Sequence, residues 1–216
     1  MSPGAVLLFV IFCLIPGHGV AELGTQPPSH LAPARASVHV VEDSQATDAF
    51  QPRADHIRAM VSTGITNLTG KASSTEAWLS LVSTQDVIGI KVFSEPGPNS
   101  GTRPAVVAAV IGELLSAGIP TNHIIIWDKH SIDLRLAGYM KLGETLGVRV
   151  AASAESGYDE TNFYDTSLIG NLVWGDLEFG KKGEGIGRKS FVSKLVSQQM
   201  TRIINITPLM NHNQVG

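Results

Sequence analysis

The chain has 216 residues, a net charge of −3 from 16 basic and 19 acidic side chains, and a hydrophobic content of 43%. This hydrophobic content is ordinary for a globular protein and is enough to fill the core of one α/β domain. The mildly acidic balance is unlike that of nucleic-acid-binding domains, so we expect no nucleic-acid partner. The single basic cluster, at 180–189, is predicted to be a solvated loop, with a phosphate-binding patch as the alternative.

The N-terminal segment predicts an exported protein. Residues 5–15 form an apolar run of 11 residues, too short for a bilayer span, which needs about 20. Small residues at Gly19 and Ala21 suit a cleavage site after Ala21. No Lys or Arg precedes the run, and a signal anchor is the alternative. We predict a signal peptide over 1–21, a secreted or periplasmic location, and no membrane span in the mature chain.

Cys13 is the single cysteine and lies inside this leader, so cleavage would leave a mature chain without cysteine. Iron–sulfur clusters, thiolate zinc sites and cysteine nucleophiles are therefore not expected in the mature chain. Residues 22–36 contain three prolines and little apolar bulk, which is typical of a flexible linker. Residues 37–216 are then expected to form a single α/β domain.

Helical and extended patterns alternate along this domain. In chain order the patterns predict a strand at 38–41, helices at 55–60 (ended by Gly64) and 75–82, a strand at 86–93, a helix at 103–117, a strand at 123–127, a helix at 132–140 continued by 142–146, a strand at 148–151, an irregular stretch at 157–189, a helix at 191–199 and a strand at 202–206. Near-continuous apolar strands suit a parallel sheet. We predict an α/β fold with a mainly parallel sheet and helices on both faces, a Rossmann-like three-layer sandwich.

The helix expected at 103–117 has the clearest signals. Thr102 is a natural N-cap, Pro104 falls in the first turn, and Gly118 and Pro120 end the pattern. Its apolar residues recur with helical spacing and define one buried stripe: Val106, Val107, Val110, Ile111, Leu114 and Leu115.

Polar residues follow several of the expected strands. In open α/β sheets, ligands bind outside the carboxyl ends of the strands. The residues expected near this edge are Lys91, Thr102, Arg103, Asp128, His130, Asn211 and His212.

The start of the helix at 103–117 favours an anion. Backbone N–H groups and the helix dipole attract negative charge, and the guanidinium of Arg103 fits a carboxylate or phosphate. The alternative is that Thr102 merely caps the helix and Arg103 is merely solvated. The loop is neither a P-loop, since no Gly-Lys-Ser/Thr follows, nor a G-x-G-x-x-G dinucleotide fingerprint.

Lys91 interrupts an apolar strand, where lysine is rare unless it is paired. It would reach solvent at the strand end, pair with Asp128 on a neighbouring strand, or bind the anion. Asp128 would act as acid or base, or cap the next helix, a role that Ser131 would also fill.

His130 would serve as an imidazole base or a metal ligand. With His212 it would complete a site for a divalent metal, while Asn211 would contact the ligand. The alternative for the segment around His212 is a plain turn, because asparagine favours turns.

Two segments carry a family resemblance. "DVIGIKVFSEPGPNSGTRPAVVAAVIGELLSAGIPTNHIIIWDKH" (86–130) and "RIINITPLMNHNQVG" (202–216) resemble domain-of-unknown-function family 362, with its "VGIKVN" strand, Gly-rich loop, "TRP" helix start, "I.IWD" strand and later "KIINVPVLKTH…G" segment. The resemblance implies an α/β domain without a settled activity. The family pattern continues beyond the last motif, so we expect the domain to be incomplete at its C-terminus.

A fainter likeness is to the cofactor-binding half of lactate racemase-like proteins, which share Thr-Arg-Pro but have an acid where this chain has Ser100. The leading hypothesis is an exported domain that binds a small anionic ligand, with metal assistance left open. A non-catalytic periplasmic binding or interaction module is the alternative, and a racemase-like domain ranks below both.

Overall fold

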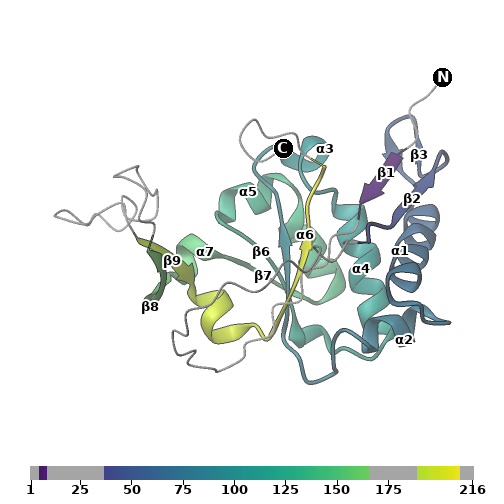
Figure 1. Ribbon diagram of the computed structural model, residues 1–216. Helices are drawn as coiled ribbons and strands as arrows, with labels where there is room; N and C mark the ends of the chain where they lie inside the picture. The colour runs from purple at the N-terminus through teal and green to yellow at the C-terminus, as the bar shows by residue number, and fades with distance from the viewer. Residues whose placement is uncertain (1–4, 9–36, 166–188, 210–216) are drawn as a thin grey trace, which may run out of the picture.

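The computed structural model describes residues 5–8, 37–165 and 189–209 (Figure 1). The leader beyond Leu8, the linker, and the predicted site residues Asn211 and His212 lie outside this description. Among the described residues, no helix is long and apolar enough to cross a membrane.

A four-stranded parallel sheet forms the centre of the molecule. Its strands lie in the order β10 (Arg202–Ile206), β5 (Ile88–Val92), β6 (Ile124–Asp128) and β7 (Arg149–Ala152), and each neighbouring pair is parallel. The predicted α/β class, with a mainly parallel sheet flanked by helices, is confirmed.

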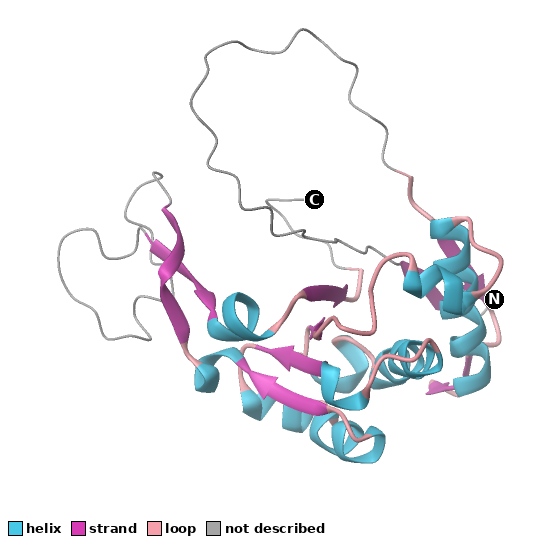
Figure 2. Ribbon diagram, turned by 90° about the horizontal axis from the view of Figure 1, so that it is seen from below, coloured by secondary structure: helices cyan, strands magenta, loops and turns pink. Residues whose placement is uncertain are grey.

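One face of the sheet holds most of the core. Alternate side chains of β5 and β6 point to this face and are fully buried, including Ile88, Ile90 and Ile126. The connection from β5 to β6 runs through α4 (Pro104–Ser116), and that from β6 to β7 through α5 (Ser131–Leu136) and α6 (Tyr139–Leu146). Figure 2 shows most of the helices gathered on one side of the sheet.

Close packing explains a glycine in α6. A Cβ atom on Gly143 would come within 2.4 Å of Val150 Cγ2 and 3.0 Å of the Val148 carbonyl oxygen on the neighbouring strand segment. A side chain at this position would therefore push the helix away from β7. Two further helices, α1 (Ala54–Thr69) and α2 (Ser74–Leu79), pack beside α4.

The opposite face is covered differently. Gly89 of β5 lies against the side chains of Trp127 and Met200, the latter placed by a π-helical turn over Leu195–Gln199. This turn leads directly into β10. The segment that covers Gly89 is therefore also the connection that precedes this edge strand of the sheet.

The remaining elements are short. β1 (Ala5–Leu8) pairs with β2 (Val40–Asp43), and β3 (Thr47–Asp48) with β4 (Gln51–Pro52). β8 (Tyr158–Asp165) and β9 (Lys189–Ser193) form an antiparallel hairpin that projects from the body of the domain (Figure 1). Single turns complete the path at α3 (Gly97–Ser100), η1 (Thr121–His123) and α7 (Ser153–Ser156).

Several predicted elements are wrong, among them the irregular stretch at 157–189, in which Tyr158–Asp165 forms the strand β8. α1 continues through Gly64, which is buried in the helix, and ends at Gly70 with a φ of 67°. The helix expected at 132–146 is broken by Gly138, whose φ of 89° no regular helix allows. The helix expected at 191–199 begins instead as a strand, because Phe191 stacks edge-to-face on Phe163 across the hairpin, with ring centroids 5.8 Å apart.

Candidate functional site

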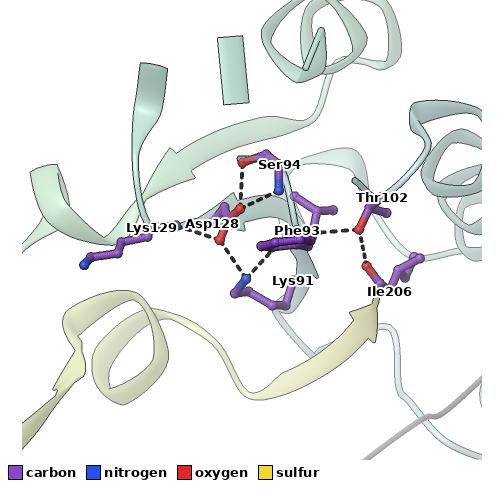
Figure 3. A network of polar contacts seen from close by, with 8 residues as sticks. Lys91, Phe93, Ser94, Thr102, Asp128, Lys129 and Ile206 are labelled. Carbon is purple, nitrogen blue, oxygen red and sulfur yellow. Dashed lines mark hydrogen bonds and ion pairs between the residues drawn. The ribbon is translucent and has the colours of Figure 1, made fainter. Parts of the chain in front are cut away.

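The centre of the candidate site is an ion pair between neighbouring strands. Lys91 Nζ donates to Asp128 Oδ1 at 2.7 Å and to the Val92 carbonyl at 2.6 Å (Figure 3). The ammonium also lies 5.6 Å from the centre of the Trp127 ring, within reach of a cation–π contact. The sequence left three alternatives open for the side chain of Lys91, and one of them, pairing with Asp128, is confirmed.

Asp128 accepts four hydrogen bonds. Oδ1 takes one from Lys91 and one at 2.8 Å from the Lys129 N–H, while Oδ2 takes two from Ser94, at 2.8 Å from its N–H and 2.6 Å from its Oγ. Burial acts to raise the pKa of Asp128, but the hydrogen bonds from Lys91 and Ser94 outweigh it and hold this pKa below its ordinary value. The carboxylate is thus ionised and fully engaged, which makes it an anchor for its neighbours and a weak base at neutral pH.

Ser94 was missed by the sequence argument. It begins the loop after β5 and is buried, with 1% of its surface exposed. Its position directly after a predicted strand was a usable signal, because polar residues at that place face the carboxyl edge of the sheet.

Lys91 retains capacity for a ligand. An ammonium group carries three N–H donors, and the described contacts with Asp128 and Val92 use two of them. The side chain of Lys91 is 29% exposed. The third donor is therefore available to a ligand oxygen.

Thr102 has a different role from the predicted N-cap. The cap residue of α4 is Arg103, and the Thr102 hydroxyl instead donates to the Ile206 carbonyl of β10 at 2.6 Å and accepts from the Phe93 N–H at 2.9 Å (Figure 3). The close approach of the loop to β5 requires glycine at 101, because a Cβ there would lie 2.3 Å from the Phe93 carbonyl oxygen. The loop is thereby drawn onto the end of β5.

Arg103 stands at the N-terminus of α4 and is half-buried. Within the part of the chain that the structure describes, its guanidinium has no hydrogen-bond or ion-pair partner. Its carbonyl accepts from Val106 and Val107, and Pro104 has no N–H. The Arg103 and Ala105 N–H groups have no partner among the described residues, so two backbone donors stand open at the start of α4.

Tyr139 supports this region from α6. Its side chain is fully buried, and its hydroxyl donates to the Thr102 carbonyl at 2.5 Å. Burial raises the pKa of Tyr139 well above its usual range, and the negative charge of Asp128 adds to the effect. The hydroxyl therefore keeps its proton and acts as a fixed hydrogen-bond donor.

His130 lies at the N-cap of α5 and is half-buried. Neither Asp128 nor Ser131 caps this helix: the Ser131 hydroxyl donates to Glu155 instead. Among the described residues, no group of three His, Cys, Asp or Glu side chains is placed to hold a metal. The predicted partners Asn211 and His212 lie outside the described ranges, so the mixed metal site stays a prediction.

No protein-family model matches the sequence, and no curated protein or solved structure matches it either. The resemblance to domain-of-unknown-function family 362 stays a prediction.

Proposed function

We propose that this chain binds a small anionic ligand at the carboxyl edge of its parallel sheet, between Lys91 and the start of α4. The observation that carries the proposal is the unpaired state of Arg103 among the described residues, in contrast to the Asp128 carboxylate and the Thr102 hydroxyl, which are both hydrogen-bonded. A half-buried charge without a partner is costly, and an anion bound there would offset that cost.

The available donors fit an oxyanion. The guanidinium of Arg103 presents two parallel N–H groups that match carboxylate or phosphate oxygens. The Ala105 N–H and the third N–H of Lys91 would contact further oxygens of the same ligand. Since Asp128 neutralises Lys91, the net positive charge of the site comes from Arg103, which favours a ligand of low negative charge.

Two versions of this function differ in whether chemistry follows binding. In the first, Asp128 and His130 act as acid and base, or His130 with His212 holds a divalent metal that polarises the ligand. In the second, the domain is a non-catalytic binding module. The four hydrogen bonds on Asp128 and its lowered pKa favour the second version, because a base must be free to accept a proton.

Calorimetric titration of the wild-type chain with acetate, lactate, phosphate and sulfate tests the binding itself. We expect saturable binding of one ligand per chain for at least one of these anions. Binding that fails to saturate with every anion would contradict the proposal. Elemental analysis of the same protein separates the two versions: a stoichiometric metal that is lost in His130→Ala supports the metal-assisted one.

We also propose that the chain is exported and processed after Ala21. N-terminal sequencing of protein recovered outside the cytoplasm is expected to begin at Glu22, since the apolar run and the small residues at Gly19 and Ala21 suit signal cleavage. Recovery of an intact N-terminus beginning at Met1 would contradict export by cleavage.

A further inference from the structure

Thr102 lies where three elements meet, and its polar groups together form hydrogen bonds to all three. Its N–H donates to the Phe93 carbonyl at 2.8 Å and its hydroxyl accepts from the Phe93 N–H, which fixes it to the end of β5. Its hydroxyl proton goes to Ile206 of β10, and its carbonyl accepts from Tyr139 of α6. With 3% of its surface exposed, Thr102 forms the junction of these elements.

The partner strand β10 is at the edge of the sheet, so β5 is its only neighbour in the described sheet. The N-terminal end of β10 is held by the hydroxyl of Thr201, which donates to Asp86 at 2.7 Å and accepts from the Val87 N–H at 3.0 Å. At its other end, the side-chain hydrogen bond that the structure describes is the one from the Thr102 hydroxyl to the Ile206 carbonyl. Thr102 therefore holds the carboxyl end of a strand that lies 104 residues away in the chain.

Arg103 follows Thr102 directly, and its carbonyl accepts the hydrogen bonds from Val106 and Val107 that form the first turn of α4. Any movement of Thr102 is transmitted by covalent geometry to the guanidinium and the open Ala105 N–H. If β10 moves away, the Thr102 hydroxyl loses its acceptor, and the contact that orients this junction on that side is lost.

We propose that Thr102 is a positioning residue that couples the docking of strand β10 to the geometry of the anion site at the start of α4. The proposal rests on the proposed function for its ligand, but the coupling of strand and helix start is a property of the fold. Coupling of this kind is reciprocal: an ordered β10 strengthens anion binding, and a bound anion orders β10.

Hydrogen exchange measured by NMR tests the coupling without any ligand. In Thr102→Val, which keeps the shape of the side chain but removes the hydroxyl, we expect the amides of 203–206 and of Val106 and Val107 to exchange about tenfold faster than in the wild type, while those of 149–152 in β7 keep their rates. Thr102→Ser is expected to restore the wild-type rates, because it retains the hydroxyl. Thr145→Val, at an exposed threonine bonded only within its own helix among the described contacts, is the matched control.

Two results would overturn the coupling. Exchange at 203–206 that stays at the wild-type rate in Thr102→Val would show that the hydroxyl does not hold β10. Exchange that rises equally at 149–152 would show a general loss of stability with no specific coupling.

The binding arm uses the anion that the wild type binds in the calorimetric titration. At a temperature where all variants are folded, we expect Kd to rise about five- to tenfold in Thr102→Val and in Tyr139→Phe, and to stay near the wild-type value in Thr102→Ser and in the exposed control Tyr164→Phe. A residue with a merely structural role would lower the melting temperature and leave Kd unchanged. A wild type that binds no anion would contradict the proposed function, and the exchange experiment would then decide the coupling alone.

Discussion

Replacing Asp128 with Ala is expected to lower the free energy of unfolding by about 2–4 kcal/mol, because it leaves Lys91 partly buried without its counter-charge and removes the acceptor of four hydrogen bonds. Urea unfolding followed by circular dichroism measures the change. The exposed variant Asp48→Ala is the matched control and is expected to stay within about 0.5 kcal/mol of the wild type.

A double variant separates the two causes of this loss. Lys91→Met with Asp128→Leu removes both charges, so no uncompensated ion remains, and the loss should be smaller than in Asp128→Ala alone. A single variant that loses less than about 1 kcal/mol would contradict the role of Asp128 as the anchor of the site.

The same pair gives the stability a pH dependence of known sign. The pKa of Asp128 in the folded chain lies below its ordinary value of 3.8, so folding favours the carboxylate. The stability from this pair is present in full above the unfolded pKa and is lost as the pH falls through the folded pKa. The wild-type excess over Asp128→Ala should therefore shrink in acid and stay constant near neutrality.

Replacing Arg103 with Ala is expected to raise Kd for the bound anion by about tenfold or more while the melting temperature stays close to that of the wild type. The guanidinium has no partner among the described residues, so its removal breaks no described contact within the chain, but it takes away the bidentate donor of the ligand. Calorimetric titration gives Kd, and thermal unfolding without ligand gives the stability.

Two further arginine variants sharpen this result. Arg103→Lys keeps the charge without the planar fork and should bind with an intermediate Kd. Arg135→Ala, at an exposed arginine of α5, should leave Kd unchanged. If Arg103→Ala unfolds at a much lower temperature than the wild type, Arg103 is structural and the site assignment is wrong.

Much of the parallel sheet could be predicted from sequence because its signals are local. The strand at 202–206 agrees with β10, and the apolar stripe of 103–117 predicted α4 to within one residue at each end. Alternating apolar segments of this kind carry their own period and boundaries, so they need no knowledge of distant partners.

The hairpin and the role of Thr102 could not be predicted in the same way. Lys189–Ser193 becomes a strand because it pairs with Tyr158–Asp165, and the Thr102 hydroxyl turns from the helix to a carbonyl 104 residues away. Both outcomes depend on contacts between remote segments, which a local pattern does not contain.

The pairing of Lys91 with Asp128 was predicted as one alternative, because adjacent parallel strands end at the same edge of the sheet.

The central claim is that an anion binds at the start of α4 beside the Lys91–Asp128 pair. The most direct measurement is an NMR titration of the wild-type chain with the bound anion, followed at each assigned backbone amide. The account predicts saturable shifts concentrated at 94, 103, 105, 106 and 129, together with smaller shifts at 204–206 through Thr102. Saturable shifts that lie elsewhere and leave the amides of Arg103 and Ala105 unchanged would contradict it.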